Sequence, residues 1–266
     1  MYDKYLDATF VNIFFIIFII LILIPFGKSV EPSGGNSSIT GSERASSAPP
    51  GSVSAQAGNV TQLDISGYTI TQAWQGYYGN VTGTLVLADS SNSLLYDWSI
   101  ASPSGEIYAS TNSSVGWPYT QCFNYTATGT FADDTSNAGA TSQFGMNLSQ
   151  IHDEFNILES APDSVDRTFN MIGESSHRDF YTSNLKFNAG QCQSTQLFDG
   201  AGNQSGLFQE ILLYEPSTAS VIFTSLIEQQ ADGFDGGLHD FEMLVLENGR
   251  EGDTDITTYY LYVELE

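Results

Sequence analysis

The sequence predicts a mainly β protein, an antiparallel β-sandwich head with one short helix, preceded by an N-terminal transmembrane or signal helix and a flexible stalk. Three observations support this fold class. Short apolar and aromatic runs recur from residue 60 onward between turn-forming residues, only one stretch stands out with helical spacing, and an apolar run followed by a Ser/Gly/Pro-rich segment opens the chain. The predicted organisation is an anchor or signal segment over 1–28, a stalk over 29–58 and a β-rich extracellular domain over 59–266.

The opening segment has the length of a membrane span. Residues 10–26 read FVNIFFIIFIILILIPF, and with Ala8 and Thr9 the stretch reaches about 19 residues, enough to cross a hydrocarbon layer as a helix. A cleaved signal peptide needs a basic start and a small-residue cleavage site. Because MYDKYLD is not net basic and GKSVEP has no such site, we expect an uncleaved anchor through residues 8–26, with secretion after cleavage as the alternative.

The predicted stalk reads SVEPSGGNSSITGSERASSAPPGSVSAQAG. It contains almost no large apolar side chain, so burial cannot offset the entropy of ordering it. A Ser/Gly/Pro-rich segment placed directly after an apolar span is typical of a spacer that holds a folded head away from a membrane.

The head is predicted as a series of short strands separated by turns. Three runs, at 83–89, 93–101 and 106–111, form a meander, with turn signals at Asp89-Ser90-Ser91-Asn92 and Ser102-Pro103-Ser104-Gly105. Further strands are expected at 121–131, 207–215, 219–228, 239–247 and 257–265. The last run, with its three tyrosines, fits a central strand better than an edge, because an unpaired edge of this composition would aggregate.

One helix is expected over residues 147–158, NLSQIHDEFNIL. Its four large apolar residues have spacings of three and four, which places them on one face, and Asn147 with Gln150 forms a capping-box pattern. These apolar residues are Leu148, Ile151, Phe155 and Leu158. Asn147 is also a glycan acceptor, and we expect only one of its two roles to be used.

The charge balance excludes nucleic acid as a partner. The chain has 31 acidic and 7 basic residues, a formal charge of −24, whereas binding to phosphates requires clustered Lys and Arg. Only 14% of residues are charged, so the surface is built mainly from uncharged polar side chains, as in many exported β proteins.

Two features indicate an extracellular compartment. Acceptor triplets N-x-[ST] are more frequent than chance predicts, at Asn36, Asn59, Asn80, Asn112, Asn124, Asn147 and Asn203. The two cysteines, Cys122 and Cys192, suit one disulfide in an exported chain, with two buried thiols as the alternative.

The stretch AWQGYYGNVTGTLVLAD contains a candidate contact surface, formed by Trp74, Tyr77 and Tyr78. In an extended chain Tyr77 and Tyr78 point to opposite faces, so at most one of them faces solvent. Core packing of these aromatics is the favoured interpretation, together with Leu85 and Leu87, and a platform that stacks on sugars or on a partner is the alternative.

The sequence contains no catalytic signature. It has no nucleophile elbow, zinc-protease helix, phosphate loop or dinucleotide motif, and His152, His177 and His239 are interpreted as packing or surface residues. A pair of carboxylates suffices for glycoside hydrolysis, but the pattern selects no pair among 31 acids. No catalytic and no cofactor-binding residue is therefore predicted.

The best candidate for a metal is calcium in the segment ADGFDGGLHDFE. Its oxygen ligands would be Asp232, Asp235 and Asp240, which lie among glycines as in flexible calcium loops. The ordered spacing of an EF-hand is absent, and an acidic glycine-rich turn is the alternative interpretation.

Four stretches, AGNVT, ITQAWQGYYGNVTGTLVL, SGEIYAS and HDFEMLVLENG…TTYYLYVELE, resemble a group of uncharacterised archaeal cell-surface proteins. That resemblance covers most of residues 57–266 and implies an exported surface protein, without implying any catalytic residue.

The function expected from these features is that of a membrane-tethered or exported cell-surface glycoprotein with a structural or adhesive role and no catalysis. Other surface proteins or glycans are the expected partners, besides the membrane itself. One alternative is a pilin-like filament subunit, although no basic-Gly processing site precedes the apolar run. The other is an exported carbohydrate-binding module or glycosidase.

Overall fold

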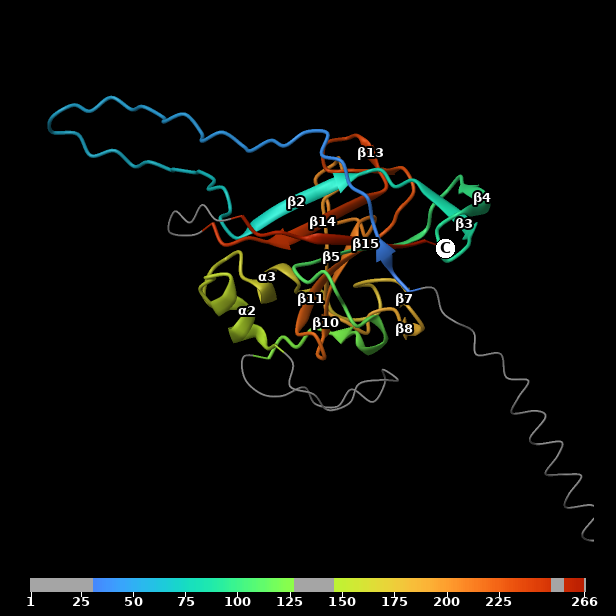
Figure 1. Ribbon diagram of the computed structural model, residues 1–266. Coiled ribbons are helices and arrows are strands. Elements are labelled where there is room, and N and C mark those ends of the chain that lie inside the picture. Colours follow the sequence, from blue (N-terminus) through green and yellow to red (C-terminus); the bar gives the residue numbers. More distant parts are fainter. Residues whose placement is uncertain (1–30, 127–145, 250–255, 266) are drawn as a thin grey trace, which may run out of the picture. The chain divides into compact units, whose positions relative to one another are not determined.

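The computed structural model describes residues 31–126, 146–249 and 256–265 (Figure 1). The predicted anchor at 8–26 and the end of the predicted strand at 127–131 lie outside these residues. Within the described ranges, no helix combines the length and the apolar character needed to cross a membrane.

The largest sheet is antiparallel and forms the centre of the head. Its strands, in spatial order, are β1 (Ser33–Gly34), β15 (Tyr260–Leu265), β5 (Gly105–Ser110), β11 (Ser220–Leu226), β10 (Gln209–Glu215) and β6 (Gln121–Cys122), with β9 (Ser194–Gln196) also paired to β10. The mainly β, antiparallel prediction is confirmed, and most of the predicted strand runs form strands. The run at 121–131 is an exception, because its described part is a strand only at Gln121–Cys122.

Alternation along the central strands directs apolar side chains to both faces of this sheet. On β10, Leu212 and Tyr214 belong to one hydrophobic cluster, and Ile211 and Leu213 belong to another. A strand buried on both faces has a continuous apolar sequence, as ILLY shows.

One face of the sheet is covered by a two-stranded ribbon and two short helices (Figure 1). The ribbon pairs β2 (Trp74–Gly79) with β14 (Phe241–Leu246), and the helices are α2 (Leu148–Glu154) and α3 (Val165–Thr168). The layer formed by this ribbon and these helices is thus smaller than the second sheet of a conventional sandwich.

The helix prediction is confirmed at its start and wrong at its end. Asn147 and Gln150 form the complete capping box, and Ile151 and Phe155 are buried. However, α2 ends at Glu154, and Asn156 has a positive φ of 50°. Leu158 therefore leaves the helical face and is 65% exposed.

The other face of the sheet is covered by a hairpin, a short helix and the disulfide. The hairpin pairs β7 (Phe180–Thr182) with β8 (Leu185–Phe187), and η1 (Trp117–Tyr119) places Trp117 against Tyr108 at 5.0 Å between ring centroids. The predicted disulfide is present and links Cys122 to Cys192 across a Cα–Cα distance of 5.4 Å.

Two further hairpins complete the described strands, β3 (Gly83–Ala88) with β4 (Leu94–Ile100) and β12 (Ala231–Asp232) with β13 (Leu238–His239). The β3–β4 hairpin corrects one prediction. Leu85 and Leu87 were expected in the core, but they are 52% and 49% exposed because no layer of the described chain covers this hairpin.

The N-terminal part of the predicted stalk joins the sheet. Ser33 and Gly34 form β1 and pair with Val263 and Tyr262 of β15, and Gly35 donates to the carbonyl of Leu261. Strand β15 therefore has a neighbour on each side, a full-length one in β5 and a two-residue one in β1.

Candidate functional site

Strand β2 divides the predicted aromatic surface between the core and solvent. The Trp74 ring contacts Phe169 and Phe223, and its Nε1 donates to the carbonyl of Asp163 at 2.8 Å. Tyr77 packs against the same hydrophobic cluster. These two rings follow the core-packing interpretation.

Tyr78 points the other way and is 53% exposed. Its ring lies 5.0 Å from that of Phe234 and 4.7 Å from that of His239, centroid to centroid. The expectation that at most one of Tyr77 and Tyr78 faces solvent is confirmed. We call Tyr78, Phe234 and His239 the aromatic cluster.

The β12–β13 hairpin positions two of the three rings. Ala231 pairs with His239, and two backbone hydrogen bonds, Gly233 N–H to Gly237 O and Gly236 N–H to Gly233 O, close the turn that presents Phe234. Gly236 has a φ of +74°, which glycine adopts without strain.

Gly233 also allows the hairpin to lie close to its neighbours. A Cβ at this position would collide with the His239 ring and would lie 2.8 Å from Oε1 of Glu242. The close approach of the ring and the carboxyl therefore depends on glycine.

Two carboxyl groups accompany the aromatic cluster. Asp235 Oδ1 accepts hydrogen bonds from His239 Nε2 and from the Gly237 N–H, both at 2.8 Å, and these bonds lower the pKa of Asp235. Glu242 is buried beside Tyr78 in the β14–β2 register, where its Oε1 accepts the Phe234 N–H at 2.9 Å. Burial raises the pKa of Glu242.

This arrangement combines half-exposed aromatic faces with an ionised acceptor at their edge. Aromatic rings stack on the apolar faces of sugars and on other rings, and carboxylates accept hydrogen bonds from hydroxyl groups. The site therefore has the chemistry of a contact surface.

The structure does not gather the three predicted calcium ligands. Asp235 bonds His239, whereas Asp240 is buried and accepts from the backbone N–H groups of Val81 and Gln230. Asp232 lies against Gly200. Among the described residues, no group of three metal-ligating side chains converges, and calcium binding stays a prediction that melting in calcium and in chelator would test.

Two of the three ring residues, Phe234 and His239, were not predicted as members of a contact surface. They come from the segment 231–242, whose aspartates and glycines suggested a calcium loop. The useful signal is an aromatic residue flanked by glycine and aspartate in a turn, which exposes the ring.

Two carboxyl groups, Glu106 and Glu264, also lie directly opposite each other on β5 and β15. Both are buried, and Glu264 Oε2 accepts from the Tyr108 hydroxyl at 3.1 Å and from the Ser183 N–H at 3.0 Å. These bonds connect β15 to the β7–β8 hairpin, and the pair forms part of the packing between layers.

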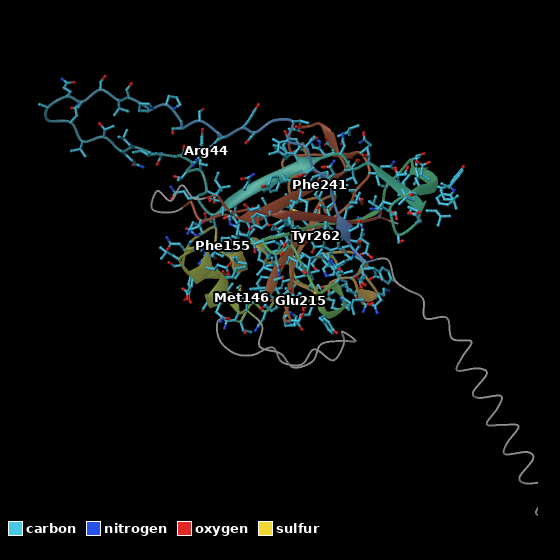
Figure 2. All side chains as sticks on the ribbon, in the orientation of Figure 1. Arg44, Met146, Phe155, Glu215, Phe241 and Tyr262 are labelled. Atoms are coloured by element: carbon cyan, nitrogen blue, oxygen red, sulfur yellow. A yellow bond between two sulfur atoms is a disulfide. The ribbon has the colours of Figure 1, made fainter. Side chains whose placement is uncertain are left out.

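A small cavity lies beside α2, at the labelled Met146 and Phe155 (Figure 2). Phe223 and Tyr259 also line it, and its volume of about 20 Å³ suits roughly one water molecule.

The seven predicted glycan acceptors lie at exposed or half-buried positions. Nδ2 of Asn112 already donates to Ser220 Oγ at 2.9 Å and to the Thr218 carbonyl at 3.3 Å, whereas Nδ2 of Asn59 makes a single longer hydrogen bond, to Gln56 Oε1 at 3.5 Å. The buried His152 and His177 are packing residues, as expected.

Comparison of the chain with protein-family models, with curated proteins and with solved structures finds no match. The resemblance to archaeal surface proteins stays a prediction.

Proposed function

We propose that this chain is a membrane-tethered cell-surface glycoprotein whose β-rich head has a structural or adhesive role. The observation that carries the role is the aromatic cluster, which presents Tyr78 and Phe234 half-exposed beside the ionised Asp235. Exposed aromatic residues are enriched at sites of protein contact, where they provide a large area with few rotatable bonds.

The disulfide and the apolar run support the surface location. Cys122 and Cys192 are bonded in the head, and disulfides persist mainly in oxidising compartments outside the cytosol. Residues 8–26 supply a membrane span in the sequence. Recovering the native chain from inside the cell with both thiols reduced would contradict this location.

The adhesive role is tested with the full chain, purified in detergent, and native envelope fragments. Replacing Tyr78 or Phe234 by alanine should weaken binding about tenfold, as expected for a ring at the centre of a contact. Tyr119→Ala is the matched control, since Tyr119 is 52% exposed and has no ring in the aromatic cluster. Equal binding by Tyr78→Ala and Tyr119→Ala would remove the aromatic cluster from the proposal.

Carbohydrate binding is the second candidate, and the pairing of rings with a carboxylate acceptor favours it. An array of immobilised oligosaccharides distinguishes the two. Binding that is competed by free sugar and lost in Tyr78→Ala would support the carbohydrate module, whereas envelope binding unaffected by sugars would support contact with protein.

A further inference from the structure

The β3–β4 hairpin exposes an apolar face. Leu85 pairs with Trp98 and Leu87 with Tyr96, and residues directly opposite each other share a face. The four side chains are between 49% and 58% exposed, and the rings of Tyr96 and Trp98 lie 4.9 Å apart. We call them the hairpin face.

The opposite side of the hairpin is mixed in character, since alternation along β4 places Leu95, which is 77% exposed, with Asp97 and Ser99 rather than with Tyr96 and Trp98. Thr84 pairs with Ser99 and Val86 with Asp97, while Asp89 Oδ1 closes the turn by accepting the N–H groups of Ser91 and Ser93. The hairpin is thus exposed on both sides, and the hairpin face, with two leucines and two adjoining rings, is the more apolar of the two. An isolated two-stranded hairpin is only marginally stable in water, so a covering surface would stabilise it.

The chain enters the head beside the root of this hairpin. Gly83, the first residue of β3, packs against the side chain of Leu265 at the end of β15. Ser33 lies opposite Val263 in the antiparallel β1–β15 pair, so the chain preceding Ser33 runs toward Leu265. Figure 1 shows β3 and β4 near the C-terminal end of β15.

The connection from the apolar run to this point is short. Phe26 and Ser33 are seven positions apart, which spans at most about 25 Å of extended chain. A membrane spanned by residues 8–26 would therefore lie within about 25 Å of the end of the head that carries the hairpin.

We propose that the hairpin face lies on the outer surface of the membrane that residues 8–26 span. This inference depends on the proposed membrane tether. Trp and Tyr favour the boundary between headgroups and acyl chains, and Leu85 and Leu87 would contact the acyl chains. A flat orientation keeps the N–H groups of the hairpin edges in the hydrated headgroup layer.

Charge and area favour a zwitterionic lipid surface over a second copy of the chain. The hairpin contains Asp89 and Asp97 and no Lys or Arg, so anionic lipids would not attract it. Four half-exposed side chains offer roughly 400 Å², about half of the area that each partner contributes to a stable protein interface.

The same placement would locate the aromatic cluster. Only Asn80, Val81 and Thr82 separate β2 from β3, so Tyr78 would meet its partners close to the membrane.

The test uses the full chain in phosphatidylcholine vesicles with and without bromine on the upper acyl chain. The chain has three tryptophans, Trp74, Trp98 and Trp117. The fluorescence of Trp98 is therefore obtained as the difference between the emission of the wild-type chain and that of Trp98→Phe. We expect brominated lipid to quench most of the Trp98 emission and to leave the emission of Trp98→Phe almost unchanged. Leu87→Ser should reduce the quenching, whereas the matched control Val86→Ser, on the other face, should not.

The outcomes separate this inference from the tether. If the chain floats with the vesicles and Trp98 emission is equal in both lipids, the tether stands and the membrane contact is overturned. If Trp98 is shielded from aqueous acrylamide but is not quenched by brominated lipid, a second copy of the chain covers the hairpin face. That result would also overturn the membrane contact. A chain that fails to float contradicts the tether and, with it, this inference.

Discussion

The Nε2 atom of His177 accepts a hydrogen bond from the backbone N–H of Cys192 at 3.0 Å, beside the disulfide. The other ring nitrogen, Nδ1, donates to the carbonyl of Arg178 at 2.8 Å, so the buried ring is neutral. His152 has the same relationship to α3, because its Nε2 accepts the Val165 N–H at 3.2 Å. Each ring can accept this backbone N–H from a neighbouring segment only in its neutral form.

The first prediction is that mild acid destabilises the head through these two rings. Burial lowers the pKa of His152 and of His177. Their contribution is therefore complete above the unfolded pKa of about 6.5 and is lost as the pH falls from there toward the folded value. The free energy of unfolding should fall by up to about 1.4 kcal/mol per pH unit for each histidine. Urea titrations at pH 7.5 and 5.5 measure it, and a double His152→Gln/His177→Gln variant with an unchanged pH slope would contradict it.

The second prediction concerns the disulfide. The bond joins positions 70 residues apart, and the chain-entropy model assigns about 4 kcal/mol to a loop of that length. Cys122→Ser/Cys192→Ser should lower the free energy of unfolding by about that amount, measured by urea titration. The wild-type chain with reductant is the comparison, because its urea midpoint should shift as far as that of the variant. Equal wild-type midpoints with and without reductant would show that the disulfide does not stabilise the head.

The third prediction is that Glu210→Gln stabilises the protein at neutral pH. The Glu210 carboxyl is fully buried, its Oε2 accepts the Leu244 N–H at 2.8 Å, and burial raises its pKa well above the usual range. Its stabilising contribution is present below the unfolded pKa of about 4.5 and is lost as the pH rises through the folded value. The variant keeps an acceptor for Leu244 without a charge, so its advantage over wild type should grow by up to about 1.4 kcal/mol per pH unit above 4.5. Thermal melts of wild type and Glu210→Gln at pH 4.5 and 7.5 measure this advantage. A stability difference that is the same at both pH values would contradict the prediction.

The fourth prediction tests the packing beneath the aromatic cluster. In Gly233→Ala the added methyl group meets the His239 ring and Glu242, and relieving the clash should cost about 1–3 kcal/mol of stability. Gly67→Ala is the matched control, since a Cβ there meets nothing within 4 Å. Thermal melts compare the two variants, and equal melting temperatures would show that the hairpin accommodates the methyl group.

The fifth prediction distinguishes among the glycan acceptors. Nδ2 of Asn112 donates to both Ser220 and Thr218, and a sugar on that nitrogen would replace one of its two hydrogens, so at least one of these hydrogen bonds would be lost. On native material, peptide mapping should therefore find Asn112 less occupied than the exposed Asn80 and Asn203. Preferential occupancy of Asn112 would contradict this expectation.

The sequence by itself determined the class of the head and much of its local structure. Alternating runs bounded by turn residues identified β3, β4, β5, β10, β11, β14 and β15. The capping box of α2 and the disulfide were also predicted correctly. These features depend on residues that are close in sequence or, for the cysteines, on there being only two of them.

Only the tertiary structure decided which apolar faces are covered. Leu85 and Leu212 both occur in aliphatic strand runs, yet Leu85 is half exposed and Leu212 fully buried, because burial depends on the layer that packs over a strand. The aromatic cluster likewise joins Tyr78 to residues more than 150 positions away. The pattern of one segment carries no information on which distant segment will lie against it, so such contacts emerge only when the layers assemble.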